Sequence, residues 1–257
     1  MALKRDRYGR PMITPPDGGK QVPYTRATTV AGALDDGYGL VQWKLRMAVA
    51  GIIQRPDLLL KASTIIDDKT GMDGLIEAAM EAAGATKAAT IGTAVHAMTE
   101  KLDRGEPLGF ILDDYKPDLI AYEKATKNLR HLHIEQMSVQ DEFRIAGTPD
   151  RVSEYKGEYF ITDLKTGSID YPHHMAIQLG IYANSKPYDV DSNTRSEWSG
   201  EINKERAIII HLPAGTGNCT LHFVDIKKGW ESLQLAMEVR QWRSVRKLTS
   251  KIMETNE

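Results

Sequence analysis

The chain has a single cysteine, Cys219, among its 257 residues. One cysteine excludes an intrachain disulfide and a four-cysteine zinc or iron–sulfur centre within one chain, and it is typical of a reducing compartment. Long apolar runs are also missing, because the stretch 47–53 falls far short of the roughly 20 apolar residues that a membrane span needs. The basic residues near the start are followed by no apolar stretch, so we expect neither a signal peptide nor a membrane anchor.

No charge of one sign predominates: 33 Lys and Arg residues stand against 35 Asp and Glu residues, for a formal net charge of −2. This balance excludes a uniformly basic coat, so a nucleic-acid partner would have to meet a local basic patch. The phosphate-binding pattern G-x-x-x-x-G-K-[ST] does not occur, and we therefore expect no ATP-driven activity. What is present, 41% hydrophobic and 26% charged residues, is the composition of an ordinary folded globular protein.

The length predicts one elaborated domain or a core with a helical appendage. Residues 1–24, with scattered proline and glycine, are expected to form an irregular N-terminal arm. A helical portion is predicted over residues 25–89, and residues 90–257 are expected to form the core. Apolar side chains recur at helical spacing in four segments of the first half of the chain, which are residues 41–53, 75–83, 91–103 and 118–131.

Short runs rich in β-branched and aromatic residues follow from residue 137 onward. The predicted order is a β-hairpin, a helix, two strands and a final helix, with a polar loop at 188–204; the segments are residues 148–155, 159–164, 172–185, 207–212, 220–226 and 229–247. This order indicates an α/β fold in which helices flank a mixed sheet.

The most informative segment is the hairpin whose turn is centred on Lys156 and Gly157. Asp150 and Asp163 are equally far from this turn, so they are predicted to lie opposite each other with their β-carbons about 4.5–5.5 Å apart. Lys165 lies two residues beyond Asp163 and therefore points to the same face of the sheet. Two like charges so placed are destabilising unless they share a proton or a cation.

Carboxylate oxygens in close pairs suit Mg²⁺ or Mn²⁺, which keep several waters and bridge to substrate phosphates. The carbonyl of Leu164 could supply another oxygen. A lysine beside such an ion can orient the attacking water, and the combination indicates metal-dependent hydrolysis of phosphodiester bonds. The alternative is that Asp150 and Asp163 are exposed residues at strand ends and that Lys165 is only an ion-pair partner.

Four short motifs occur in order along the chain: Gly92-Thr-x-x-His96-x-x-x-Glu100, Gly147-x-x-Asp150, Asp163-x-Lys165-Thr166 and Gln178-x-x-x-Tyr182. Together they resemble the RecB-type branch of the PD-(D/E)xK nuclease superfamily, over roughly residues 90–225. The resemblance implies the restriction-endonuclease-like fold of that superfamily for the core, with the helical portion as an addition. The whole chain is similar in size and layout to phage recombination exonucleases.

The resemblance also implies roles for individual residues. Asp150, Asp163 and Lys165 would be catalytic, and the metal ion, Mg²⁺ or Mn²⁺, would be held by His96, Asp150, Asp163 and the Leu164 carbonyl. Glu100 on the helix of His96 and Glu142, in the strand that leads to the hairpin, would support the site. Gln178 and Tyr182 would contact the DNA strand or support Lys165. With one cysteine, the chain lacks the iron–sulfur cluster that several members of this branch hold with four cysteines.

DNA binding by a chain of nearly balanced charge requires basic side chains that lie on one face. Arg240, Arg243, Lys247 and Lys251 recur at three- and four-residue spacing on the predicted final helix, so they are candidates for phosphate contacts, although a solvated face is the alternative. Lys44 and Arg46 lie beside Trp43, a combination that suits a single strand.

The sequence therefore predicts a Mg²⁺- or Mn²⁺-dependent DNA exonuclease active in recombination, repair or phage DNA processing, without ATP. A structure-specific endonuclease with the same site is an alternative, and so is a non-catalytic DNA-binding protein on a nuclease fold. DNA is the expected partner, together with a single-strand annealing or recombination protein. An oligomer is compatible with the sequence, and the expected location is the cytoplasm, that of the host if the protein is phage-encoded.

Overall fold

The computed structural model describes residues 3–250 of the chain. At its centre is a five-stranded sheet in which β11 runs parallel to β8 and the other neighbours are antiparallel, so the sheet is mixed. Its strands, in spatial order, are β12 (Thr220–Asp225), β11 (Arg206–His211), β8 (Glu158–Lys165), β7 (Arg151–Tyr155) and β4 (Arg130–Ile134).

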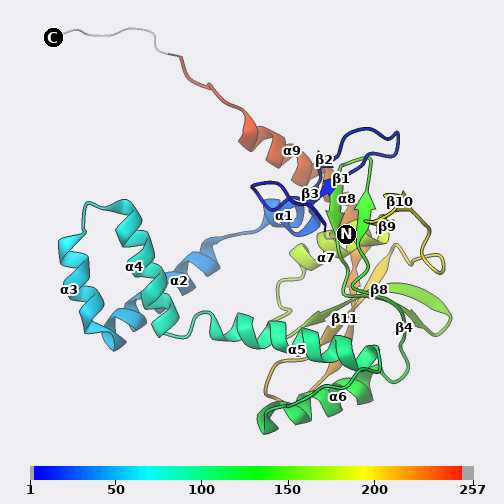
Figure 1. The fold of residues 1–257 in the computed structure, drawn as a ribbon, viewed down its shortest axis with the longest axis horizontal. Coiled ribbons are helices and arrows are strands. Elements are labelled where there is room, and N and C mark those ends of the chain that lie inside the picture. The colour runs from blue at the N-terminus through cyan, green and yellow to red at the C-terminus, as the bar shows by residue number, and fades with distance from the viewer. Residues whose placement is uncertain (1–2, 251–257) are drawn as a thin grey trace.

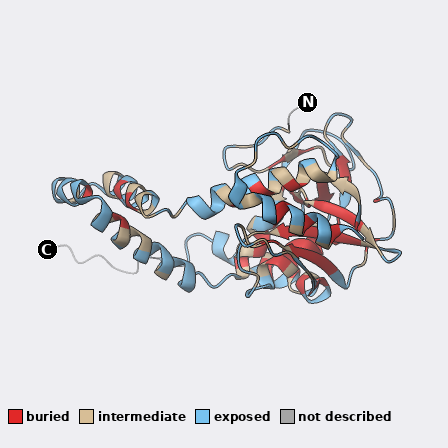
Figure 2. Cartoon of the chain, turned by 90° about the horizontal axis from the view of Figure 1, so that it is seen from below, coloured by how far each residue is buried: buried red, intermediate tan, exposed pale blue. Residues whose placement is uncertain are grey.

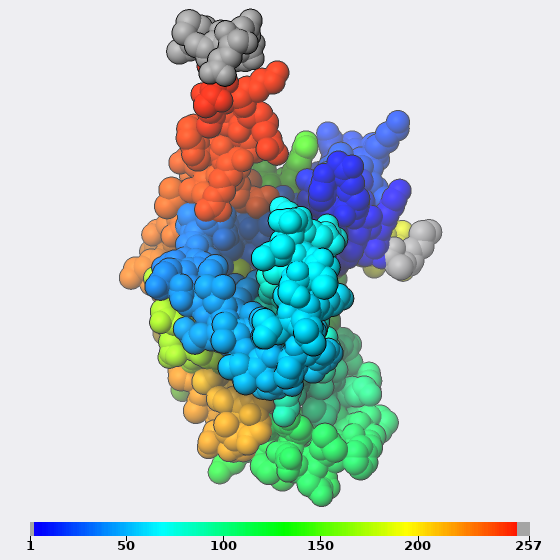
Figure 3. All heavy atoms as spheres, turned by 90° about the vertical axis from the view of Figure 1, so that its left-hand side faces the viewer, coloured from blue at the N-terminus to red at the C-terminus, as the bar shows by residue number. Residues whose placement is uncertain are grey.

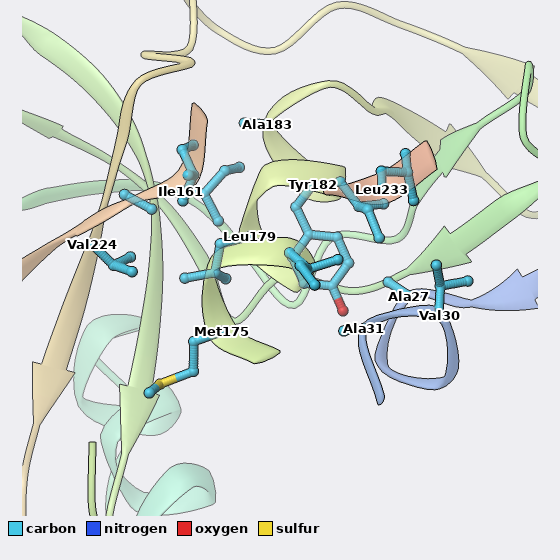
Figure 4. Close-up of a cluster of buried hydrophobic side chains, with 14 of the residues drawn as sticks. Ala27, Val30, Ala31, Ile161, Met175, Leu179, Tyr182, Ala183, Val224 and Leu233 are labelled. Carbon is cyan, nitrogen blue, oxygen red and sulfur yellow. The ribbon is translucent and has the colours of Figure 1, made fainter. Parts of the chain in front are cut away.

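Helices cover both faces of this sheet (Figure 1). On one face, a cluster of buried side chains joins the sheet to α1 (Ala27–Ala31), α7 (His173–Ala183), α8 (Ile226–Glu231) and α9 (Leu233–Ser244). On the other face, a second cluster joins it to α5 (Lys87–Asp103) and α6 (Lys116–Thr126). Figure 4 shows the first cluster, with Ile161 of β8 on one side of α7 and Ala27 and Val30 of α1 on the other. The core is therefore a three-layer α/β structure.

A second five-stranded sheet packs beside the first, and the sequence patterns did not predict it. Its spatial order is β10 (Thr194–Arg195), β9 (Lys186–Asp189), β5 (Ser138–Gln140), β6 (Ile145–Gly147) and β3 (Thr25–Arg26). A separate pair is formed by β1 (Met12–Ile13) and β2 (Val22–Pro23). Residues predicted to be an irregular arm and a polar loop thus contain strands, because two- to four-residue strands are too short to show a periodic pattern.

Three helices project from the core as a helical arm, which consists of α2 (Tyr38–Gln54), α3 (Pro56–Thr64) and α4 (Lys69–Ala82). Figures 1 and 2 show the arm standing away from the sheets, with most of its surface exposed, and Figure 3 shows it end-on in blue to cyan. Helices α2 and α4 touch closely: a β-carbon on Gly51 would lie 1.7 Å from the carbonyl oxygen of Ala79. The arm's own apolar core consists of little more than Leu58, Leu75 and Ala79.

Several helix bounds differ from the sequence prediction; for example, α4 begins at Lys69 rather than at residue 75. The helix predicted over 118–131 ends at Thr126, because residues from Arg130 onward pair with β7 as strand β4. The single helix predicted over 229–247 is two helices, α8 and α9, and α9 ends at Ser244. Two short 3₁₀ helices, η1 (Gly32–Leu34) and η2 (Asp113–Tyr115), complete the elements of the described residues. No helix within residues 3–250 is long and apolar enough to cross a bilayer.

Candidate active site

The predicted hairpin is present, with the turn where the sequence places it. Lys156 and Gly157 have φ values of 53° and 83°, as the two central residues of a type I′ turn require. The register pairs Tyr155 with Glu158 and Arg151 with Thr162. Asp150 therefore lies at the entry to β7, one residue before the last pair, and Asp163 follows Thr162 in β8. The hairpin geometry brings the two aspartates together at one end of the main sheet.

Asp163 is buried, the side chain of Asp150 is 15% exposed, and the charges of the two aspartates interact. Burial and the neighbouring charge of Asp150 raise the pKa of Asp163 to about 6, although Lys165 acts in the opposite direction. Burial also raises the pKa of Asp150, while a hydrogen bond from the backbone of Leu164 opposes this rise. The pair thus holds excess negative charge in a poorly solvated place, which a cation would relieve.

Lys165 lies against the pair from the same strand. Its Nζ is 2.5 Å from Asp163 Oδ2, and the lysine side chain is 29% exposed. This contact is an ion pair whose angles are not those of a hydrogen bond. Asp163 Oδ2 is therefore one of the buried side-chain atoms in residues 3–250 that have no hydrogen-bond partner. Lys165 therefore reaches from the buried carboxylate toward solvent.

His96 lies on α5, the helix that packs with α6 on one face of the main sheet, and its side chain approaches the aspartates. Its Nδ1 lies 3.4 Å from Asp150 Oδ2. Burial lowers the pKa of His96, and this effect outweighs the nearby negative charge of Asp163. The imidazole is therefore held in its neutral form, which is the form that can bind a metal ion.

Gly92 explains how α5 comes so close to the end of β8. A β-carbon at this position would lie 2.8 Å from the hydroxyl oxygen of Thr166, the residue after Lys165. A cavity of about 430 Å³ opens beside this contact, lined by Ala88, Ala89, Gly92, Thr93, His96 and Thr166. The glycine of the first motif is thus a close-approach residue that lets His96 reach the site.

Gln178 and Tyr182 lie on one face of α7, as predicted, but both side chains are buried. Gln178 Nε2 donates a hydrogen bond to Tyr182 Oη at 3.3 Å. The exposed fractions are 9% for Gln178 and 3% for Tyr182, so the direct DNA contact predicted for them does not agree with their burial. Tyr182 packs on Gly147, where a β-carbon would lie 2.7 Å from the tyrosine ring. The pair supports the loop that leads to Asp150.

The two predicted supporting glutamates have different positions. Glu100 lies on α5 one turn after His96 and pairs with Arg104 at 3.0 Å, and its charge contributes to the raised pKa of Asp150. Glu142 was predicted in a strand near the site, but it lies in the exposed turn between β5 and β6 of the second sheet. That placement was wrong because residues 141–144 form a turn.

Glu135 occupies the neighbourhood expected for Glu142. Its backbone N–H donates a hydrogen bond to the Asp150 carbonyl at 2.9 Å. Burial, with the charges of Asp150 and Glu100, raises the pKa of Glu135 to about 7. Sequence reasoning missed this acid because the preceding strand β4 was taken as the end of a helix; a strand prediction for residues 130–134 would have placed Glu135 beside Asp150.

The basic stripe is shorter on the helix than predicted. Arg240 and Arg243 lie on α9 and line a cavity of about 250 Å³ with Thr29, Gly32, Ala33 and Ser244. Arg240 Nη1 donates a hydrogen bond to the Thr29 carbonyl at 3.4 Å. Lys247 lies beyond the end of α9 with φ of 60°, so its predicted place on the helix was wrong. Lys251 lies outside the described residues.

The chemistry of the donor set fits a hard divalent cation. The buried Asp163, the largely buried Asp150 and the neutral imidazole of His96 lie near the ends of β7 and β8, and Asp163 Oδ2 has no hydrogen-bond partner among residues 3–250. Within the same residues, no three His, Cys, Asp or Glu side chains are grouped so that they alone could hold a metal ion. Mg²⁺ is ordinarily held by one or two carboxylates and keeps several waters, so the aspartate pair suffices.

The candidate site thus places paired aspartates and a lysine at the end of a hairpin, in a mixed sheet between helices. Residues 111–184 match the family model of the PD-(D/E)XK nuclease superfamily. This segment contains Asp150, Asp163, Lys165, Gln178 and Tyr182, and the match supports both the superfamily and the fold class predicted from the sequence. A search of curated proteins gave no match to the chain.

Proposed function

We propose that the protein is a DNA exonuclease dependent on Mg²⁺ or Mn²⁺, of the RecB-type branch, which acts in recombination, repair or phage DNA processing. The observation that carries the proposal is the convergence of Asp150, Asp163 and Lys165 at one end of β7 and β8. Degenerate, non-catalytic relatives would be expected to lack part of this set, and here every member is in place.

Each residue has a role that its position supports. Asp150 and Asp163 would hold the cation with the Leu164 carbonyl, and His96 would complete the set as a neutral ligand. A divalent cation bound there supplies Lewis-acid polarisation of the phosphate and lowers the pKa of a water. Lys165 would donate a hydrogen bond to the attacking water and orient it in line with the leaving oxygen. Gln178 and Tyr182 hold the Gly147 loop from below.

DNA would approach from the side on which Lys165 reaches solvent. Arg240 and Arg243 are candidates for phosphate contacts because they line one cavity and form no ion pair among the interactions found in residues 3–250. Lys44 and Arg46, exposed beside Trp43 on α2, are a second candidate surface. The arm joins the core at α5, next to the cavity at His96, so it lies near the proposed path of the DNA.

The test is digestion of end-labelled single- and double-stranded DNA with Mg²⁺ or Mn²⁺, set beside EDTA. An exonuclease releases mononucleotides or short products from a labelled end and leaves a covalently closed circle intact. Nicking or linearising of the circle would replace the proposal by the structure-specific endonuclease. Binding of DNA without cleavage in either metal would favour the non-catalytic protein.

A further inference from the structure

A buried polar cluster lies behind the candidate site, and the proposed chemistry does not use it. We call it the Arg151 cluster. Its members come from α5, α6, β4 and β7, and they are Thr99, Asp103, Tyr122, His131 and Arg151. Arg151 is 2% exposed and is among the largest fully buried side chains of residues 3–250. A buried guanidinium is costly unless its charge and its N–H groups find partners.

Arg151 finds those partners on one helix. Its Nε donates a hydrogen bond to Asp103 Oδ2 at 2.5 Å, and its Nη2 donates to Thr99 Oγ1 at 3.0 Å. The two acceptors lie four residues apart on α5, hence on one face of the helix. The planar fork of a guanidinium fits two such acceptors at fixed geometry, which the single ammonium of lysine does not.

Asp103 is itself held from two further elements. Tyr122 Oη of α6 donates to both carboxylate oxygens, at 2.9 and 2.8 Å. His131 of β4 places its Nε2 3.5 Å from Asp103 Oδ1. The Tyr122 ring also lies 5.6 Å from the Arg151 guanidinium carbon. Asp103 therefore has little freedom to follow Arg151, and the pair fixes α5 against β7.

Both ends of this connection carry residues of the candidate site. Arg151 directly follows Asp150 in the chain, and Thr99 Oγ1 donates a hydrogen bond to the backbone carbonyl of His96 at 3.0 Å. A continuous series of contacts thus runs from the His96 backbone through Thr99 and Arg151 to the backbone of Asp150. His96 lies at the α5 end of this connection and Asp150 at the β7 end, and His96 Nδ1 is 3.4 Å from Asp150 Oδ2.

We propose that Arg151 is a positioning residue for the metal site, which sets the placement of His96 on α5 relative to Asp150 at the start of β7. The inference rests on the proposed metal-dependent nuclease function. It assigns to a buried arginine, which touches neither the substrate nor the metal ion, the task of keeping two ligands from different elements in register. Residues that orient metal ligands in this way typically contribute about 10- to 100-fold to metal affinity or activity.

The variants are Arg151→Lys, Thr99→Val and Thr99→Ser in the full chain. Arg151→Lys keeps the charge but loses the fork, while Thr99→Val breaks the link to His96 and leaves the Arg151–Asp103 pair in place. Thr99→Ser retains the hydroxyl. Arg195→Lys is the matched control, because Arg195 of β10, in the second sheet, forms a partly buried pair with Asp141 at 2.7 Å and its side chain is 13% exposed. Mn²⁺ binding is measured by calorimetry without DNA, and unfolding is measured in EDTA.

We expect Arg151→Lys and Thr99→Val to weaken Mn²⁺ binding by about 10- to 100-fold, whereas Thr99→Ser and Arg195→Lys bind Mn²⁺ like the parent. Folded Thr99→Val protein with parental Mn²⁺ affinity would overturn the inference and leave the nuclease proposal intact. If Arg151→Lys does not fold, the comparison of Thr99→Val with Thr99→Ser decides. A parent that neither binds Mn²⁺ nor cuts DNA would overturn the proposed function, and this inference with it.

Discussion

Asp150 accepts a hydrogen bond through Oδ2 from the backbone N–H of Leu164, at 2.8 Å. Leu164 stands between Asp163 and Lys165, so this one bond fixes the Asp150 carboxylate to the strand that carries the other two catalytic candidates. The remaining carboxylate oxygens are then held close to one another in a buried place, and their charges repel. The predictions below follow from this arrangement.

Removing one charge of the aspartate pair should affect cleavage and folding stability in opposite directions. We expect Asp163→Asn to abolish cleavage with Mg²⁺ and to be at least as stable as the parent in EDTA, because the substitution relieves a like-charge repulsion. Chemical unfolding in EDTA and cleavage of labelled DNA in Mg²⁺ are the measurements. A fully active Asp163→Asn protein would show that the site has been assigned to the wrong residues.

The aspartate pair also predicts a pH dependence of the metal-free protein. The pKa of Asp163 is about 6 in the folded chain and about 4 in an unfolded one. Because folding raises the pKa of Asp163, protonation of this carboxyl stabilises the folded chain. The gain is complete below about pH 4 and is lost as the pH rises through about 6. In EDTA, Asp163→Asn should gain stability relative to the parent between pH 4 and 7, on the order of 3 kcal/mol. A difference that does not change with pH would contradict the raised pKa.

Lys165 is proposed to act in the chemical step. Lys165→Ala should therefore lower turnover by about 10²- to 10⁴-fold, while Mn²⁺ affinity is retained or improved because a neighbouring positive charge is gone. Calorimetry with Mn²⁺ and single-turnover cleavage separate the two effects. Loss of metal binding in a well-folded Lys165→Ala protein would instead make the lysine an organiser of the site.

The Gly147 loop has no space for a side chain, since a β-carbon there would lie 2.7 Å from the Tyr182 ring. Gly147→Ala must displace a buried tyrosine, so we expect the free energy of unfolding to fall by about 1–3 kcal/mol. Gly37→Ala is a control, because a β-carbon at Gly37 would meet nothing within 4 Å. Equal stability of the two variants would mean that Tyr182 yields without cost and does not brace the loop.

Phosphate binding by the two arginines of α9 is tested by salt dependence. With Ca²⁺ in place of Mg²⁺, to bind without cutting, Arg240→Ala and Arg243→Ala should each flatten the slope of log affinity against log salt by about one unit or less. The weakening should be similar for all DNA sequences. Arg55→Ala is the control, because Arg55 is already paired with Asp57 at 2.7 Å on the arm. An unchanged slope in the double variant would make these arginines part of a solvated face.

The hairpin and its register could be predicted because local sequence determines them. A glycine turn sets the pairing, and the pairing alone brings Asp150 and Asp163 together whatever the rest of the chain does. The motif with Gly92 and His96 lies on a helix that its own apolar spacing predicts. These features need no knowledge of distant contacts, and the structure has them where the sequence indicates.

The features that escaped prediction depend on distant contacts. Arg151 looks like an exposed strand residue until α5 supplies Thr99 and Asp103, many residues earlier in the chain. Strand β4 begins inside the segment 118–131 that was predicted to be a helix, and Glu135 was missed with it. The short strands of the second sheet owe their conformation to partners rather than to their own composition.

The helical arm leaves the core after η1 and returns to it at α5. It departs after Asp35, which is joined to His174 at the start of α7 at 2.9 Å, and it returns at the first turns of α5, which line the cavity at His96. The candidate site residues lie on the core strands and on α5, whereas the arm is one uninterrupted segment between η1 and α5. A change in the length of that segment would leave the strands of the core in place, so the arm can vary independently of the candidate site.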